Sequence, residues 1–380
     1  MTDKGHELSD DARTKEDGSP LRRGWTTGAC ATAATKSALH ALYCGAFEDP
    51  VSLRLPKGEE PSFALASEAL GSDYAEAGII KDAGDDPDVT HGALILARVK
   101  RGMPGCGVTF KGGVGVGQVT RPGLPLSVGE PAINPVPRQM MSAVVEDLAA
   151  RFEESPDVEI TISVPDGERL AEKTWNPRLG IIGGLSILGT TGVVHPYSCS
   201  AWIHSIHRGI DVANAEELPH VAGATGSTSE KVVQTHYDLP DHAMLDMGDF
   251  AGGLLKYLRR HPRPRLTIGG GFAKLTKLAQ GYLDLHSARS QVDFDWLAKR
   301  AREAGVSNAC ADKIAEANTA THGREIALEE TVDLAPIIAR RAQETALKTL
   351  HDAPVVVDVM VIDRQGHLIA HEGAKGSEND

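Results

Sequence analysis

The chain has 380 residues, with 39 lysine and arginine residues against 52 aspartate and glutamate residues, which gives a formal net charge of −13. This acidic balance argues against a nucleic-acid-binding protein, because such proteins need clustered cations, and no apolar run is long enough to span a membrane. The length favours two domains. Five scattered cysteines without a CxxC pair indicate neither a disulfide framework nor a zinc knuckle, so we expect a soluble cytoplasmic protein with reduced thiols.

The first half of the chain predicts a mixture of helices and strands. Residues 1–20 are polar and are expected to form a disordered tail. Thr26 or Thr27 can cap an alanine-rich helix that runs to Tyr43, and Gly45 is a suitable stop. Further elements are predicted as strands over 94–100 and 158–164 and as helices over 137–152 and 198–208.

The second half repeats one pattern three times: a short apolar strand, a glycine turn and a helix. The turns fall at 225–227, at Gly248-Asp249 and at 269–271, a repeat that is typical of a parallel α/β layer. Helices are then predicted near 293–304, 308–318, 322–330 and 334–350, followed by a closing hairpin of 355–362 and 367–371 and a second disordered tail at 373–380.

Two acid-free stretches stand out in this acidic chain, between Asp88 and Glu130 and between Lys173 and Ile210. Both combine glycine with lysine or arginine, which suits an anionic ligand held by cationic side chains and exposed backbone N–H groups. Ordinary strands with charged edges would give the same composition, so both interpretations stay open.

The segment 81–88 holds four carboxylates, at Asp82, Asp85, Asp86 and Asp88. Carboxylates so close raise one another's pKa, which suits a general base or a divalent cation site. A solvated turn is the alternative, because aspartate, glycine and proline are turn-forming residues.

Other patterns are weaker. Gly113, Gly115 and Gly117 form a GxGxG, but no P-loop is present. His204 and His207 are three residues apart on a predicted helix and could bind a metal, although surface histidines are the favoured interpretation. Cys30 lies at a predicted helix start, where the dipole would lower its pKa, but a buried small residue is the better expectation.

The three glycine turns of the second half could hold a nucleotide-like cofactor, because open α/β sheets bind ligands beyond the carboxyl ends of their strands. The candidate cofactor-binding residues are Gly226, Ser227, Asp249, Gly269 and Gly270. Asp249 could accept a hydrogen bond from a ribose hydroxyl, or it could cap the helix that follows.

Five segments resemble, in order, the sequence blocks of the CbiD proteins of cobalamin biosynthesis. They are 21–31 (LRRGWTTGACA), 81–90 (KDAGDDPDVT), 129–138 (GEPAINPVPR), 183–192 (GGLSILGTTG) and 281–287 (GYLDLHS). The resemblance extends from about Leu21 to Leu368. The chain departs from the family at Trp25, where tyrosine is commoner, and at His195, in a variable position.

The resemblance implies an S-adenosylmethionine-dependent methyltransferase that methylates C-1 of cobalt-precorrin-5B to give cobalt-precorrin-6A. It implies an α+β domain, placed here at 21–215 and expected to bind the macrocycle, followed by a Rossmann-like α/β domain at 216–372 that would bind the methyl donor. No protein-bound metal is expected, because the cobalt belongs to the substrate. Nor is a nucleic-acid or membrane partner expected, and a homo-oligomer is compatible with the sequence.

We assign roles on this basis. The substrate has acetate and propionate groups, which arginine forks bind well, and glycine lets the backbone approach a flat ring. A base would remove a proton during methyl transfer. The candidate base is one of Asp82, Asp85, Asp86 and His204. The candidate substrate-binding residues are Arg22, Arg23, Thr26, Thr27, Arg98, Arg101, Arg121, Arg138, Gly183, Gly184, Thr190 and Thr191. Two alternatives stay open: an ATP-dependent phosphoryl-transfer enzyme and a non-catalytic tetrapyrrole carrier.

Overall fold

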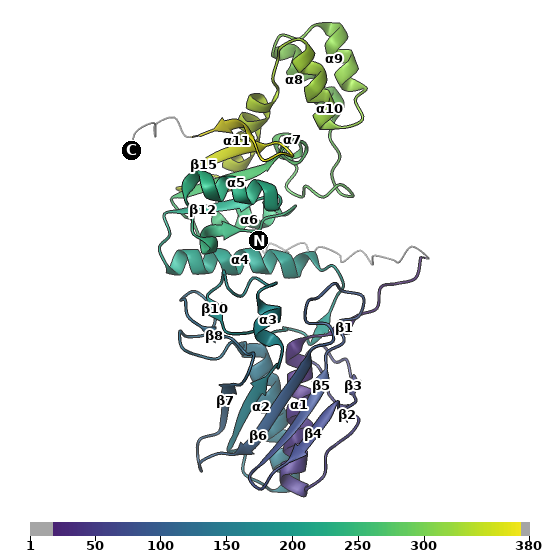
Figure 1. The fold of residues 1–380 in the computed structure, drawn as a ribbon, viewed down its shortest axis with the longest axis vertical. Helices are drawn as coiled ribbons and strands as arrows, with labels where there is room; N and C mark the ends of the chain where they lie inside the picture. The colour runs from purple at the N-terminus through teal and green to yellow at the C-terminus, as the bar shows by residue number, and fades with distance from the viewer. Residues whose placement is uncertain (1–17, 374–380) are drawn as a thin grey trace, which may run out of the picture. The chain divides into compact units, whose positions relative to one another are not determined.

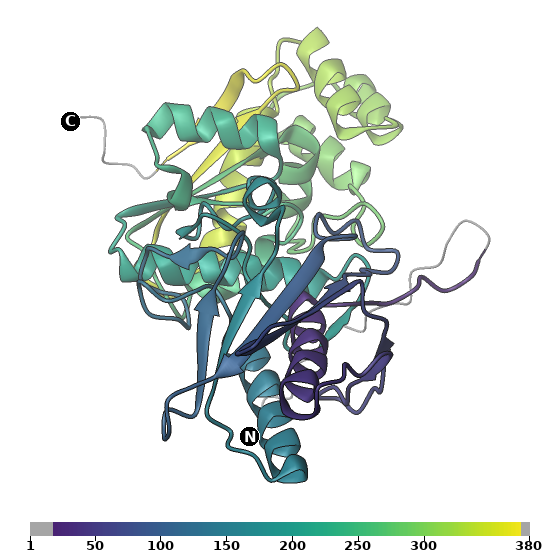
Figure 2. The same cartoon turned by 60° about the horizontal axis from the view of Figure 1, so that its bottom comes forward.

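The structure is a computed structural model that describes residues 18–373. Most of both predicted disordered tails, 1–20 and 373–380, therefore lies outside the described residues. The protein is a mixed α/β protein whose chain divides into two compact units, one ending at Ala201 and the other beginning at Trp202 (Figures 1 and 2). No helix within the described residues combines the length and hydropathy needed to cross a bilayer.

The first unit is built on a five-stranded sheet with the strand order β4-β5-β6-β9-β7. Its strands are β4 (Ser67–Leu70), β5 (Tyr74–Ile80), β6 (Leu94–Arg101), β7 (Val108–Gly112) and β9 (Val158–Ser163). Neighbouring strands are antiparallel except for the β7–β9 pair. Alternate residues such as Ala77, Ala97 and Ile160 are fully buried, so one face of the sheet carries the core.

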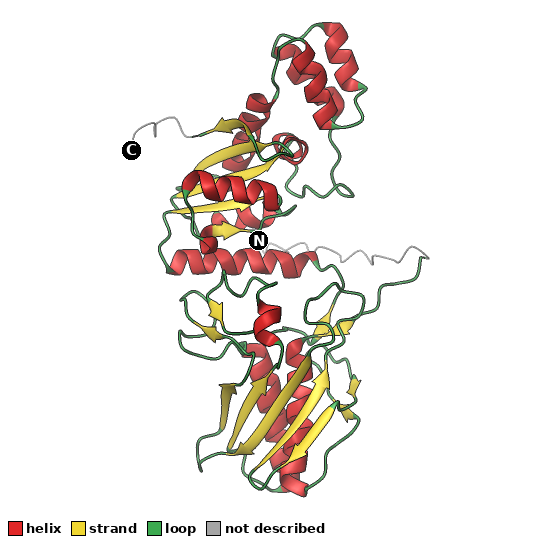
Figure 3. Ribbon diagram, viewed as in Figure 1, coloured by secondary structure: helices red, strands yellow, loops and turns green. Residues whose placement is uncertain are grey.

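Two helices cover that face, as the ribbon shows (Figure 3). Helix α1 (Thr27–Cys44) is capped by Thr26 and ends at Gly45, which has a φ of +81°; both predicted ends are confirmed. The alanines of α1 allow it to lie close to β5 and β6. Helix α2 (Pro135–Phe152) begins two residues before the predicted Pro137. The short elements β1 (Gly24–Trp25), β2 (Val51–Ser52), β3 (Ser62–Phe63), β8 (Gln118–Val119), α3 (Gly167–Ala171), β10 (Ile181–Ile182) and β11 (Val193–Val194) complete this unit.

The second unit contains a sheet with the order β13-β12-β14-β15-β16, in which the first four strands are parallel and β16 is antiparallel. The strands are β12 (His220–Ala224), β13 (Met244–Leu245), β14 (Arg265–Gly271), β15 (Val356–Ile362) and β16 (Leu368–Glu372). The three predicted strand–turn–helix repeats and the closing hairpin are confirmed.

Both faces of this sheet are buried. Helix α5 (Ser227–Tyr237) covers one face, where it packs on Ala222 and Met360, and the alternating residues Val221 and Val359 belong to the larger core on the other face. That core also takes residues from α4 (Cys199–Ala215), α6 (Ala251–Leu258), α7 (Phe272–Ala279), α8 (Phe294–Glu303), α9 (Asn308–Ala315), α10 (Ala320–Glu329) and α11 (Ala335–Leu350). A 3-10 turn, η1 (Asp241–Ala243), precedes β13.

The division between the units falls earlier than the boundary expected at 215/216, and the helix predicted over 198–208 continues to Ala215. Ile206, Ile210 and Ala213 of α4 are fully buried in the core of the second unit. The helix therefore continues to the expected boundary because its apolar side chains pack in that core.

Candidate functional site

Four segments that are distant in the sequence meet in the first unit, where β5 ends and β6 begins. The backbone N–H of Trp25 donates to the carbonyl of Asp82 at 2.7 Å, and that of Gly28 donates to Leu188 at 2.9 Å. The N–H of Asn134 donates to the carbonyl of Ile187 at 2.9 Å. The structure therefore brings together 21–31, 81–90, 129–138 and 183–192, the four segments of the first unit singled out in the sequence.

Glycine is required where these segments touch. A Cβ on Gly24 would lie 2.0 Å from the carbonyl carbon of Ala83, and one on Gly84, whose φ is +69°, would lie 2.1 Å from the carbonyl oxygen of Arg22. A Cβ on Gly28 would lie 2.7 Å from Cγ of Pro137. No side chain fits in these positions, so the glycines hold the segments in backbone contact.

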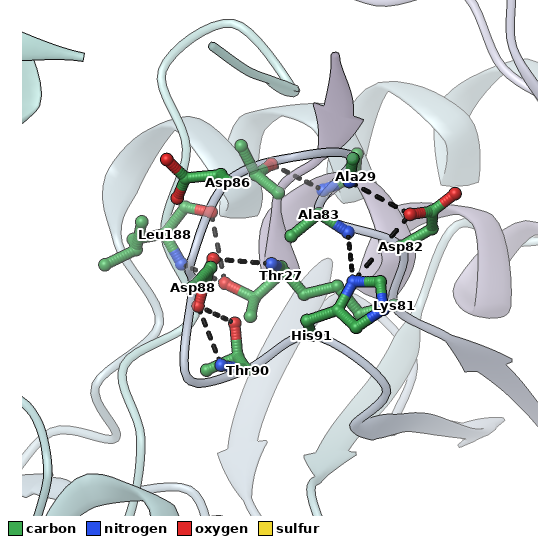
Figure 4. A network of polar contacts seen from close by, with 12 residues as sticks. Thr27, Ala29, Lys81, Asp82, Ala83, Asp86, Asp88, Thr90, His91 and Leu188 are labelled. Atoms are coloured by element: carbon green, nitrogen blue, oxygen red, sulfur yellow. Dashed lines mark hydrogen bonds and ion pairs between the residues drawn. The ribbon is translucent and has the colours of Figure 1, made fainter. Parts of the chain in front are cut away.

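The loop 81–93 carries the acidic cluster, and Figure 4 shows the contacts that Asp88 makes with Lys81 and Thr90. Arg22 donates from both terminal nitrogens to the Asp82 carboxylate, one of them at 2.9 Å. These hydrogen bonds hold the pKa of Asp82 at about 2. The backbone N–H of Arg22 donates to Asp85 Oδ2 at 2.6 Å, so two of the carboxylates fix the segment before β1 to the loop.

Lys81 lies in the candidate site, although the sequence analysis assigned it no role. It is 1% exposed, and its Nζ donates to Asp88 Oδ2 at 2.6 Å. The other oxygen, Asp88 Oδ1, accepts from the N–H and the hydroxyl of Thr90 at 2.7 and 2.6 Å. Burial alone would raise the pKa of Asp88, but Lys81 and Thr90 hold it below its ordinary value. The signal was present, because an apolar strand runs directly into this lysine.

Asp86 differs from the other carboxylates of the loop. Its Oδ1 accepts from the backbone N–H of Tyr197 at 2.7 Å. Burial raises the pKa of Asp86 above its ordinary value, although this hydrogen bond opposes the shift. Burial therefore gives Asp86 a higher affinity for a proton than an exposed aspartate has, whereas the pKa values of Asp82 and Asp88 are lowered. Nothing in the sequence distinguished it from Asp85.

His91 lies beside the cluster and was also missed. Its Nδ1 accepts from the backbone N–H of Ala83 at 3.1 Å and lies 3.8 Å from Asp82 Oδ1, as Figure 4 shows. The Nδ1 lone pair is used in this contact, so the neutral ring carries its proton on Nε2.

Cys30 is fully buried near the loop, which confirms the buried small residue expected there. Burial raises the pKa of its thiol to about 12.

The threonines of the candidate substrate site have structural contacts. The Thr26 hydroxyl accepts from the N–H of Ala29 at 3.1 Å as the cap of α1, and the Thr27 hydroxyl bonds to both the N–H and the carbonyl of Leu188. The Thr191 hydroxyl accepts from the N–H of Val193 at 3.2 Å, whereas Thr190 is exposed. The first three side chains thus position the backbone.

The glycine-rich segments separate into packed and open positions. A Cβ on Gly115 would lie 1.9 Å from the carbonyl oxygen of Val164, and one on Gly184 would lie 2.3 Å from Gly115. The GxGxG of 113–117 therefore serves close backbone packing. Gly183, in contrast, is exposed, and a Cβ there would meet nothing within 4 Å.

The six candidate arginines do not form one cluster. Arg98 pairs with Glu76 at 2.9 Å, Arg101 pairs with Glu154 at 2.7 Å, and Arg138 pairs with Glu130 at 2.9 Å. Arg101 is the last residue of β6, at the opposite end from the acidic loop. Arg121 lies against Gly180, where its side chain leaves no room for a Cβ. Arg22, the exposed Arg23 and Arg138 belong to the converging segments.

The carboxyl ends of β12, β13 and β14 carry the candidate cofactor residues. A Cβ on Gly226 would meet nothing within 4 Å, and one on Gly271 would meet only the carbonyl oxygen of Ile362 at 4.0 Å. Gly269 and Gly270 are different, because a Cβ there would lie 2.5 Å from Val233 and 2.9 Å from Thr225. Close packing thus explains why glycine stands at 269 and 270. At Gly226 and Gly271 the backbone is not covered by neighbouring atoms, and a ligand could approach it.

Asp249 does not cap α6, whose N-cap is Phe250. Its Oδ1 lies 3.0 Å from Nζ of Lys274, and that Nζ also donates to the carbonyl of Thr225 at 2.8 Å. Lys274 therefore links the ends of β12 and β13, a role that the sequence did not indicate. Ser227 is the exposed first residue of α5.

His204 belongs to the second unit, on α4. Its ring centroid lies 6.1 Å from that of His207, which stacks on Tyr257 at 3.9 Å. Burial lowers the pKa of His207. Among residues 18–373, no three histidine, cysteine, aspartate or glutamate side chains are grouped as a metal site would require.

Family models match most of the chain. Residues 14–196 match CbiD, and residues 284–373 match the CbiD C-terminal domain. A "Cobalt-precorrin-5B C(1)-methyltransferase" of Brucella anthropi is 64% identical over 350 residues, which cover 92% of this chain and 95% of that protein. A protein of the same name from Brucella abortus (strain S19) is 63% identical over the same shares. The chain belongs to the CbiD family.

One solved structure is also similar. A crystal structure of the cobalamin biosynthesis protein CbiD from Archaeoglobus fulgidus has 27% sequence identity, covers 75% of this chain and 85% of its own, and superposes with a TM-score of 0.39.

Proposed function

We propose that the protein is a cobalt-precorrin-5B C(1)-methyltransferase of cobalamin biosynthesis that uses S-adenosylmethionine as methyl donor. The observation that carries the proposal is the 64% identity to the Brucella anthropi methyltransferase over 95% of that protein. Four segments of the first unit carry the family resemblance, and they converge at one place. Such convergence is expected of residues that share a binding or catalytic site.

The macrocycle is proposed to bind at this convergence. Arg23 is exposed and could reach a peripheral carboxylate, and Gly183 presents open backbone. Two large apolar side chains of the same region, Leu188 and Tyr197, are 48% and 49% exposed and suit contact with a flat conjugated ring. Arg22 remains a candidate, but its guanidinium is already paired with Asp82.

Asp86 is proposed as the proton acceptor. Asp82 is a weak base, because its pKa is about 2, and Asp88 is held ionised by Lys81 and Thr90. Asp86 has a raised pKa, which brings it closer to the range in which a carboxylate can accept and release a proton at physiological pH. Its hydrogen bond from Tyr197 fixes the orientation of the carboxylate.

The residues at the sheet edge of the second unit fit the methyl donor. After β12 the chain adds β13 on one side of it and β14 on the other. Ligands of open α/β sheets bind outside the carboxyl ends of the strands at such a point. We therefore propose that the methyl donor binds at these strand ends, as in a Rossmann-like domain. Gly226 and Gly271 leave open backbone before α5 and α7, and neither helix has a side-chain cap. S-adenosylmethionine supplies an electrophilic methyl group when bound. Asp249 keeps its ion pair with Lys274 and is proposed to accept a hydrogen bond from a ribose hydroxyl of the donor.

The activity is tested by incubating the purified protein with cobalt-precorrin-5B and methyl-labelled S-adenosylmethionine. The expected product carries one labelled methyl group, detected by mass spectrometry. A tight macrocycle complex without methyl transfer would instead support the carrier, and ATP-dependent turnover without S-adenosylmethionine would support phosphoryl transfer. Either result would overturn the proposal.

The donor site is tested by calorimetric titration with S-adenosylhomocysteine. Gly226→Ala and Asp249→Ala are expected to weaken binding by about tenfold or more, because the first fills open backbone and the second removes a charged acceptor. Both variants should keep the thermal unfolding temperature of the parent protein. Unchanged binding in both would move the donor away from this edge while leaving the activity in place.

A further inference from the structure

A half-exposed tryptophan lies beside the strand ends at which the methyl donor is proposed to bind. Trp202 is in the first turn of α4, and it contacts the segment 246–250, which follows β13. Its side chain is 45% exposed. The proposed methyl transfer has not yet required this residue, and the sequence did not single it out.

The apolar face of α4 extends past the core to this ring. Trp202, Ile206 and Ile210 are each four residues apart, a spacing that puts side chains on one face of a helix. Ile206 and Ile210 are fully buried in the core of the second unit. Trp202 continues the same face beyond that core, and much of its ring is left uncovered.

The orientation of the ring is fixed by its neighbours. The Nε1–H of Trp202 donates to the backbone carbonyl of Asp246 at 2.8 Å, and the ring of Phe250 lies 6.2 Å away, centroid to centroid. An indole has a single hydrogen-bond donor and no acceptor. Because the donor is already used, the exposed part of the ring can offer a ligand only apolar, aromatic surface. A ring held in place also loses little conformational entropy when a ligand binds.

Backbone contacts connect the ring to the candidate donor residues. A Cβ on Gly248, whose φ is +55°, would lie 3.3 Å from Cζ2 of Trp202, so the ring lies against this glycine. The N–H of Gly248 donates to the carbonyl of Ala224, the last residue of β12, at 2.9 Å. Asp249 is the next residue along the chain, and Gly226 is two residues beyond Ala224. The aromatic surface and both candidate donor residues therefore belong to one cluster of strand ends.

We propose that Trp202 binds the purine base of the methyl donor by stacking. This inference rests on the proposed donor site and adds to it the residue that recognises the base. A purine is flat and aromatic, and stacking on an aromatic side chain needs no hydrogen bond from that side chain. Asp249, on the segment that the ring contacts, is the proposed partner of the ribose, and the ribose is the group joined to the base.

The test titrates the whole protein with S-adenosylhomocysteine and, separately, with adenosine, by calorimetry. Trp202→Leu is expected to weaken the binding of both ligands by about tenfold or more, because both carry the purine. Trp202→Phe keeps an aromatic ring and should restore most of the affinity. Trp296→Leu is the matched control: it makes the same replacement on α8, where the ring contacts Arg300, and it should leave both affinities unchanged.

Fluorescence gives a second readout that a purely structural role of Trp202 would not produce. The chain has four tryptophans. Saturation with S-adenosylhomocysteine should change the tryptophan emission of the parent protein, because the base lies on the indole. The change should be absent in Trp202→Phe, although that variant still binds, and it should persist in Trp296→Leu.

The outcomes separate this inference from the proposed donor site. If Asp249→Ala weakens binding and Trp202→Leu does not, the base lies elsewhere and the donor site stands. Loss of S-adenosylhomocysteine binding without loss of adenosine binding would place the ring against another part of the donor and would also overturn the inference. No binding by the parent protein would overturn the donor site and this inference together.

Thermal unfolding separates a folding defect from a binding defect. At one ligand concentration, S-adenosylhomocysteine should raise the unfolding temperature of Trp202→Phe and Trp296→Leu as it does that of the parent protein. The increase should be smaller for Trp202→Leu, even if that variant is itself less stable. An equal increase in all four proteins would contradict stacking on Trp202.

Discussion

Single residues in the acidic loop show how neighbouring carboxylates acquire different chemistry. Asp82 has its pKa held at about 2 by Arg22, whereas burial raises the pKa of Asp86. Asp85 bonds to a backbone N–H, and Asp88 bonds to a buried lysine. The sequence predicted an acidic cluster but could not distinguish its members, because Asp82, Asp85 and Asp86 bond to partners 60 or more positions away in the chain.

Asp86→Asn is expected to separate stability from activity. The amide oxygen can still accept from Tyr197, and the variant avoids burying a charge, so its free energy of unfolding at neutral pH should equal or exceed that of the parent protein. If Asp86 accepts the proton, methyl transfer should fall by a factor of about 10² to 10⁴. The measurements are urea denaturation and a single-turnover assay. Asp85→Asn is the control, and an equal loss of activity there would contradict the assignment.

His220 makes the stability of the second unit depend on pH. Burial, reinforced by the charge of Arg265, lowers the pKa of His220 to about 4 from an ordinary 6.5, and its Nε2 bonds to the hydroxyl of Thr267 at 2.8 Å. Between these two values the unfolded chain binds a proton that the folded protein does not. Stability should therefore be retained above pH 6.5 and lost as the pH falls toward 4.

His220→Gln keeps a polar partner for Thr267 and removes the titration. The difference in unfolding free energy between the parent and this variant, measured by urea denaturation, should shift in favour of the variant as the pH falls from 6.5 to 4. His322→Gln, which makes the same replacement at an exposed histidine of α10, is the control. Parallel pH profiles for the parent protein and His220→Gln would show that His220 is not responsible.

Elements joined through backbone contact depend on glycine more than on side chains. Gly24→Ala would place its Cβ 2.0 Å from the Ala83 carbonyl carbon, so β1 and the acidic loop must separate. We expect a loss of about 1–3 kcal/mol in the free energy of unfolding, measured by urea denaturation. The adjacent Arg23→Ala changes an exposed residue and should be nearly neutral. A neutral Gly24→Ala would mean that the contact is not maintained in solution.

The sequence predicted elements better than contacts. Periodicity, caps and glycine stops located α1 and the β15–β16 hairpin, because those signals are local. The glycine turns of the second unit were located, but not which of them stay open: Gly269 and Gly270 are filled by packing, whereas Gly226 and Gly271 are not. The dispersal of the arginines also escaped prediction, because sequence spacing does not show which acid each one pairs with.

At the scale of the whole molecule, the two units have separate cores. The buried cluster of the first unit uses residues up to Val193, and that of the second begins at Ile206. No buried apolar residue of the described chain belongs to both clusters. A single cooperative unfolding transition is typical of one domain with one core. Because the two units have separate cores, we expect two thermal unfolding transitions.

Differential scanning calorimetry tests this expectation and locates the ligand at the same time. S-adenosylhomocysteine at about 100 times its dissociation constant should stabilise only the unit that binds it, by about 2.7 kcal/mol, and we expect the second unit to be the one affected. Gly24→Ala should lower the other transition alone, which assigns that transition to the first unit. A single transition whose calorimetric and van't Hoff enthalpies agree would contradict independent unfolding. A shift of the Gly24-sensitive transition by the ligand would place the methyl donor in the first unit, among the converging glycine segments rather than at the ends of β12 and β14.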